Sequence, residues 1–206
     1  SYLQQARQHW SQLGIDLLLG SQLDIPLTSE QAMFLPDYLA KGMDGATLHG
    51  RLLVDSMHTV LEASTAAPVA SLVTPLLFFS LLLLAGIVLS FSKARLARRL
   101  LNGLDIIVFL GVGLIGLLLV VLWIIRVDTV CRDNYNLLWA LPTHLPIAFV
   151  LLKGKRWIRL YFKCTYILGL LLVVAWFFLP QQLNTALLPL VAFLILRSYC
   201  RSKSPH

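Results

Sequence analysis

The residues best suited to chemistry lie in one stretch near the middle of the chain, from Asp133 to His144. The stretch opens with polar side chains and runs into an apolar segment that still contains two prolines, a threonine and a histidine. Lipid offers no hydrogen bonds, so broken helix and polar groups at membrane depth are tolerated only inside protein or beside a water-filled cavity. The pattern predicts that the membrane half of any site lies here.

His144 offers the widest range of chemistry in this stretch. A neutral imidazole can act as a base or bind a lipid headgroup, and it can equally hydrogen-bond a carbonyl that Pro142 or Pro146 exposes. Asn136 and Trp139 have a structural interpretation too, as a helix cap and an interfacial anchor. Both interpretations stay open.

Seven residues are candidates for binding lipid or substrate, and one of them is a weak catalytic candidate. Asp16 and Asp24 flank Gly20 as turn or capping carboxylates that are also placed to bind a ligand. His144 is the weak catalytic candidate. The full set is Asp16, Asp24, Asn134, Asn136, Trp139, Thr143 and His144.

Motifs for common catalytic and cofactor chemistry are absent from the sequence. It contains no nucleophile elbow, phosphate-binding loop, zinc-protease motif or dinucleotide fingerprint. The three cysteines are far apart and lack metal-ligand spacing, so we expect no metal, no cofactor and no disulfide framework. Cys131 is a weaker candidate nucleophile on the outer face. A loop separates it from His144, so residue spacing does not show that the two side chains form a nucleophile–base pair.

The composition is that of an integral membrane protein. Of the 206 residues, 58% are hydrophobic and 13% charged, whereas soluble domains have roughly 45–50% apolar residues. Residues 1–68 carry three basic and seven acidic side chains, and the remainder carries fourteen basic and three acidic ones. The basic residues form short runs between apolar segments, which is typical of membrane anchoring and not of nucleic-acid binding.

We expect an all-α membrane protein with about five transmembrane helices after a small helical head. The head covers residues 1–67 and includes a helix over 48–63, the membrane domain covers 68–199, and the tail covers 200–206. The expected spans are 69–91, 104–125, 137–152, 160–179 and 184–197. Few ionisable groups lie inside these spans, which makes a channel or proton relay the weaker interpretation.

The distribution of Lys and Arg predicts the orientation. Basic residues concentrate after the first and third spans and in the tail. By the positive-inside rule, the head and the stretch from Asp133 to His144 face outward and the C-terminus is cytoplasmic. Chemistry built from these parts therefore faces the periplasm or the cell exterior.

Three segments together resemble one family: Trp10 to Gly20, Glu30 to Leu39 and Asn134 to His144. They look like the later half of the Lnb-type proteins, which join a periplasmic domain related to cysteine-peptidase folds to a C-terminal helical membrane region. The resemblance implies N-acylation of bacterial lipoproteins, in which an acyl chain passes from a phospholipid to the amino group of the lipid-modified N-terminal cysteine. Phospholipid and lipoprotein are then the expected partners.

The resemblance also places the family's nucleophilic cysteine and its histidine in an earlier periplasmic part, to which no residue of this chain corresponds. We therefore expect this chain to supply the membrane platform, with the N-terminal part of the same protein as a further partner. The alternative is a non-enzymatic inner-membrane scaffold, whose head docks a periplasmic partner.

Overall fold

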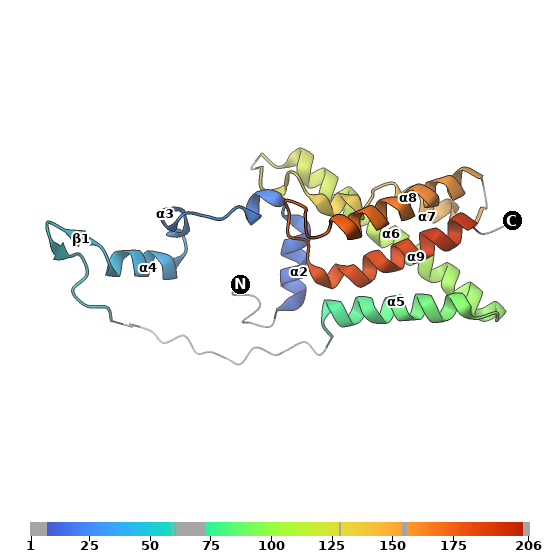
Figure 1. The fold of residues 1–206 in the computed structure, drawn as a ribbon, viewed down its shortest axis with the longest axis horizontal. Coiled ribbons are helices and arrows are strands. Elements are labelled where there is room, and N and C mark those ends of the chain that lie inside the picture. The colour runs from blue at the N-terminus through green and yellow to red at the C-terminus, as the bar shows by residue number, and fades with distance from the viewer. Residues whose placement is uncertain (1–7, 59, 61–72, 128, 154–155, 204–206) are drawn as a thin grey trace. The chain divides into compact units, whose positions relative to one another are not determined.

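The computed structural model describes residues 8–58, 60, 73–127, 129–153 and 156–203. The chain divides into two compact units, which are described separately. The membrane unit consists of Ser1–Asp24 with Ala70–His206, and the insert unit is Ile25–Val69. The described residues are mostly helical, as expected, and Figure 1 shows the elements in order.

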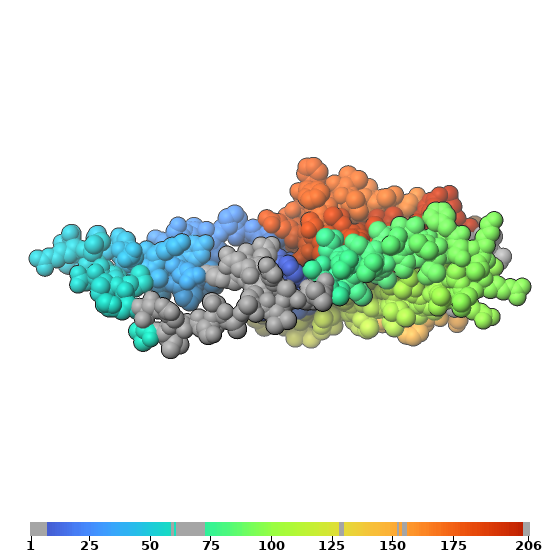
Figure 2. All heavy atoms as spheres, turned by 90° about the horizontal axis from the view of Figure 1, so that it is seen from below, coloured from blue at the N-terminus to red at the C-terminus, as the bar shows by residue number. Residues whose placement is uncertain are grey.

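Four apolar helices build most of the membrane unit: α5 (Pro75–Phe91), α6 (Arg95–Ile125), α8 (Arg156–Ala175) and α9 (Leu188–Lys203). α5 packs against α6 and α9, and α8 packs against α9. Figure 2 shows α5 along one face of this bundle. Many large apolar side chains on α5, α6 and α8 remain exposed, as a lipid-facing surface requires.

The bundle has two chemically different ends. α6 and α8 begin at the end that we call the basic end, where α5 and α9 finish (Figure 1). At the opposite end, α2 (His9–Leu18) lies across the helices near the start of α5 (Figure 1). We call this the α2 end.

The helices long enough to cross a membrane are fewer than expected. Among the described residues, three qualify by length and composition: Arg95–Ile125, Arg156–Ala175 and Thr185–Lys203. α5 is a shorter apolar helix of 17 residues. The expected count of five spans therefore stays a prediction.

The expected third span, residues 137–152, is not one helix. It consists of the 3-10 turn η3 (Tyr135–Leu138), a non-helical piece, the seven-residue α7 (His144–Val150) and the 3-10 turn η4 (Leu151–Lys153). Pro142 supplies no N–H for a continuous helix. Pro146 fits because it lies in the first turn of α7, where backbone N–H groups have no helical partner.

Glycines of α6 make room for this broken segment. A Cβ atom on Gly116 would lie 1.9 Å from the Ala140 carbonyl oxygen, and one on Gly113 would lie 2.4 Å from the Leu145 nitrogen. The irregular backbone thus presses directly against α6. Trp139 and Ala140 are buried there whereas Thr143 is exposed, so protein covers most of the non-helical backbone, as a membrane requires.

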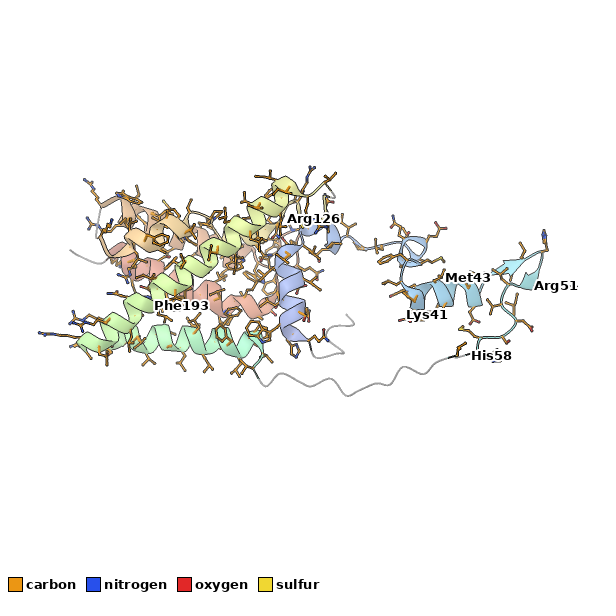
Figure 3. All side chains as sticks on the ribbon, turned by 180° about the vertical axis from the view of Figure 1, so that it is seen from behind. Lys41, Met43, Arg51, His58, Arg126 and Phe193 are labelled. Atoms are coloured by element: carbon orange, nitrogen blue, oxygen red, sulfur yellow. The ribbon has the colours of Figure 1, made fainter. Side chains whose placement is uncertain are left out.

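α9 makes close contacts with two other helices, α5 and α6. Figure 3 labels Phe193, whose ring lies so close to α5 that a Cβ on Gly86 would come within 2.5 Å of it. Towards the basic end, Arg197 donates to both carboxylate oxygens of Asp105 on α6, at 2.7 and 2.8 Å. Arg201 donates to the same carboxylate. Asp105 is fully buried, so this ion cluster joins α6 to α9 inside the protein.

The insert unit differs from its expected form. A capping box between Thr28 and Gln31 begins α3 (Ser29–Ala32), and Pro36 begins the separate helix α4 (Pro36–Asp44). Strands β1 (Thr47–Leu48) and β2 (Arg51–Leu52) then form an antiparallel hairpin. The expected helix over 48–63 is therefore wrong at its start. His49 and Gly50 both have positive φ, which favours a tight hairpin turn over a helix.

Candidate functional site

Side-chain amides attach the end of α2 to the bundle. Asn134 Nδ2 donates to the Leu17 carbonyl oxygen at 2.7 Å, and Asn136 Nδ2 donates to that of Asp16 at 3.1 Å. Gln181 Nε2 donates to the Leu19 carbonyl oxygen at 2.8 Å. The last carbonyls of a helix have no partner within it, so these amides replace the missing donors.

The same amides are held in place by further hydrogen bonds. Asn136 Oδ1 accepts from Trp139 Nε1 at 3.0 Å, and Asn134 Oδ1 accepts from the Asn136 backbone nitrogen at 3.0 Å. Gln181 Oε1 accepts from the Tyr135 backbone nitrogen. Asn134, Asn136 and Trp139 are buried, so their polar atoms serve the contact with α2 and not an open surface.

A cleft of about 640 Å³ opens at the α2 end, and we call it the α2 cleft. α2 forms one wall with His9, Gln12 and Asp16. The start of α5 and the segment Gln182–Ala186 before α9 form the others. Gln182 and Asp16 also line an adjoining hollow of about 190 Å³, which includes Asp24. The two expected carboxylates therefore line two openings that share Asp16 and Gln182.

Two helical segments begin at the α2 cleft. Thr74 caps α5, its hydroxyl accepting from the Leu77 backbone nitrogen. Asn184 caps the 3-10 turn η5 (Thr185–Leu187), its Oδ1 accepting from the Ala186 nitrogen at 3.0 Å. The start of a helix such as α5 carries a partial positive charge and favours anionic groups nearby.

Asp16 brings a carboxylate to this cleft. Its Oδ2 accepts from Asn184 Nδ2 at 2.7 Å. Burial raises the pKa of Asp16 above its usual value, the bond from Asn184 opposes this, and the nearby charge of Asp24 raises the pKa further. Asp24 Oδ2 accepts from the Gln182 backbone nitrogen at 2.8 Å. Asp16 is thus easier to protonate than an ordinary aspartate.

His144 and Thr143 lie elsewhere, between α7 and α8. The Tyr161 hydroxyl of α8 is 2.6 Å from His144 Nδ1 and 2.9 Å from Thr143 Oγ1. The His144 side chain is 1% exposed, and its ring meets Phe109 of α6 edge to face. It therefore faces protein and not lipid, and it lines neither opening at the α2 end.

The structure thus divides the seven candidate residues into three groups. Asp16 and Asp24 line openings, and Asn134, Asn136 and Trp139 fasten α2. The exposed Thr143 and the buried His144 meet at the Tyr161 hydroxyl. Cys131 is buried. Among the described residues, no three His, Cys, Asp or Glu side chains gather as metal ligands.

Sequence reasoning missed three amides of this region: Gln181, Gln182 and Asn184. All three lie in the link between α8 and α9, on the same side of the membrane domain as Asp133. The available signal was the run of polar residues after Pro180, between two apolar segments. It also missed the ion cluster of Asp105, Arg197 and Arg201, for which the signal was a carboxylate within an apolar segment.

The fold and the cleft define a helical membrane protein with a polar opening at one end. A family model described as the Lnb transmembrane domain matches residues 68–203, and the chain belongs to the Lnb family. No curated protein matches the chain. No solved structure matches it either.

Proposed function

We propose that this chain is the membrane part of an acyltransferase that N-acylates lipoproteins with a phospholipid as donor. The observation that carries the proposal is the α2 cleft, a polar opening at one end of an Lnb transmembrane domain. In the proposed orientation the α2 end faces the periplasm of a bacterial inner membrane, and the C-terminus is cytoplasmic, because basic residues gather at the other end.

The cleft has the groups that such a reaction needs around it. The acceptor is an amine, which is cationic near neutral pH and must lose its proton before it attacks. Asp16 offers a carboxylate for that ammonium group. The start of α5 favours the negative charge of a phosphate or of a developing oxyanion. The exposed apolar side chains of α5, such as Leu76 and Leu77, offer a surface for acyl chains.

The overall reaction exchanges an ester for an amide. The acyl carbon leaves a glycerol oxygen of the phospholipid, which gains a proton, and bonds to the lipoprotein nitrogen, which loses one. On this proposal the nucleophilic cysteine and its histidine belong to the N-terminal part of the same protein. This chain holds the acyl donor and the amine in reach of them, which lowers the barrier by orientation.

The site residues have different roles in this proposal. Asp16 and Asn184 contact substrate at the α2 cleft, and Asp24 contacts it at the adjoining hollow. Asn134, Asn136 and Trp139 are positioning residues, because they fix the α2 wall of the cleft. His144 supports the broken segment from inside the bundle, the exposed Thr143 joins it at Tyr161, and neither residue lines the α2 cleft.

The proposal is tested with Asp16→Asn and Asn184→Ala in the complete protein. The readout is the mass of the N-terminal lipopeptide of a lipoprotein from cells whose only copy of this protein is the tested variant. We expect the N-acylated fraction to fall about tenfold or more, which corresponds to roughly 1.4 kcal/mol of lost transition-state stabilisation. Asp44→Asn is the control, because Asp44 is an exposed carboxylate of the insert unit. Full N-acylation in both cleft variants at equal protein level would refute the proposal.

One feature favours the scaffold alternative. The insert unit exposes several large apolar side chains, among them Phe34, Leu52 and Met57, which suit the docking of another protein. A pure scaffold would leave lipoprotein acylation unchanged when the whole protein is deleted. The same mass measurement therefore separates the two functions.

A further inference from the structure

A second cleft lies at the basic end of the membrane unit. It has a volume of about 730 Å³ and lies between the start of α8 and the end of α9, two helices that pack together. We call it the basic cleft. Its lining is Arg156, Trp157, Arg159, Leu160, Lys163 and Ser202.

The charged side chains that line the basic cleft are all positive. Arg156, Arg159 and Lys163 are spaced at i, i+3 and i+7 on α8, so they share one face of that helix. No acidic residue is in the lining. The ion pairs found in the described part of the chain join Asp105 to Arg197 and Arg201, and include none of the three cleft cations. The cleft is therefore suited to an anion.

Arg159 has a side-chain nitrogen that the described part of the protein leaves without a hydrogen-bond partner. Its Nε atom is buried and has no hydrogen-bond partner among the described residues. A buried N–H group without a hydrogen-bond partner destabilises the folded protein. Because Nε has almost no accessible surface, a ligand oxygen bonds it only if the Arg159 side chain turns toward the cleft.

The cleft also has an apolar side. Trp157 is 51% exposed and Leu160 is 62% exposed, and both lie beside the cations in the lining. A tryptophan at the start of an apolar helix is typical of the membrane interface, where lipid headgroups lie. A ligand that is anionic at one end and apolar at the other fits both features.

We propose that the basic cleft binds the phosphate group of an anionic phospholipid. The guanidinium groups of Arg156 and Arg159 match the geometry of phosphate oxygens, and Lys163 adds a point charge. Trp157 and Leu160 contact the glycerol and the upper acyl chain. Basic pockets between transmembrane helices commonly take such headgroups. The inference concerns the opposite end of the bundle from the α2 cleft and does not rest on the proposed acyl transfer.

The test uses the purified chain in detergent with phosphatidylglycerol, phosphatidylcholine or inorganic phosphate added. Native mass spectrometry counts retained lipid, and thermal unfolding measures stabilisation. We expect phosphatidylglycerol to be retained and to raise the unfolding temperature, and expect the double variant Arg159→Gln, Lys163→Gln to lose both effects. The matched control is Arg98→Gln, Arg99→Gln, which removes two exposed cations of α6 that are outside the cleft.

A second measurement covers the case in which the cleft variant does not fold. Brominated phosphatidylglycerol should quench the fluorescence of Trp157, taken as the difference between the unaltered chain and Trp157→Phe. Brominated phosphatidylcholine should quench that difference at least threefold less. Equal quenching by the two lipids, equal lipid retention in the cleft and control variants, or full stabilisation by inorganic phosphate alone would each overturn the proposal.

Discussion

The side-chain amide of Asn136 donates to the backbone carbonyl of Asp16, which lies 120 residues earlier in the chain. One polar residue of the broken membrane segment thus completes the end of α2. The side chain of Asp16 points to the α2 cleft at the same place. The attachment of α2 and the chemistry of the cleft therefore depend on neighbouring atoms of one residue.

Replacing Asn136 by alanine should loosen α2. The change leaves the Asp16 carbonyl and Trp139 Nε1 without their partner, and each unsatisfied buried group costs about 1–3 kcal/mol. We expect a lower unfolding temperature and faster proteolysis next to α2. Gln8→Ala is the control, because Gln8 is exposed. An unchanged proteolysis pattern in Asn136→Ala would mean that the amide does not hold α2.

Two glycines of α6 should respond oppositely to alanine. In Gly116→Ala the new Cβ meets the Ala140 carbonyl oxygen, and overpacking of this kind costs about 1–3 kcal/mol. In Gly111→Ala the new Cβ meets nothing within 4 Å, and an alanine stabilises a helix interior by roughly 0.5–1 kcal/mol. Thermal unfolding of the two variants compares them directly. Equal stability would show that the broken segment does not press on α6.

Substitutions in the ion cluster at the basic end should have non-additive effects on the free energy of unfolding. Asp105→Asn leaves Arg197 and Arg201 without their carboxylate, and breaking a buried pair in this way costs about 3–5 kcal/mol. The double variant Asp105→Leu, Arg197→Leu should lose less than the sum of the two single variants. A double-mutant cycle on unfolding free energies measures this coupling. Additive losses would show that the two side chains act independently.

Stability should depend on pH through Asp16. Its pKa is raised in the folded state, so the folded chain binds the proton more tightly than the unfolded chain does. The resulting stabilisation is present below the unfolded pKa and is lost as pH rises through the folded pKa. Asp16→Asn should remove this part of the pH dependence. Identical pH profiles of unfolding for the two proteins would contradict the raised pKa.

The sequence predicted the broken membrane segment because proline and polar residues within an apolar stretch indicate a helix break without any knowledge of tertiary contacts. It did not predict what Asn134 and Asn136 bind, since the carbonyls of Leu17 and Asp16 are far away in the chain. Asn184 was missed because an asparagine just before a helix indicates an N-cap, and nothing in the sequence indicates that its side chain also donates to Asp16. The hairpin at His49 was missed because apolar spacing alone fits a helix as well as a strand.

The sequence predicted the candidate site only in part. Asp16 and Asp24 were identified by residue type, and the structure shows that both line openings at the α2 end. His144 was selected for its chemistry, yet its place in the fold depends on packing against Phe109 and Tyr161. Such packing involves three separate segments, and residue spacing within one segment does not determine it.

The central claim is that the α2 cleft receives the lipoprotein. It is tested most directly by placing a photoreactive amino acid at Thr185, which lines the cleft, and irradiating cells that make the complete protein. The control position is Leu160, at the basic end. Lipoprotein should be crosslinked from position 185 and not from position 160. Crosslinking of lipoprotein from position 160 alone, or from neither position, would contradict it.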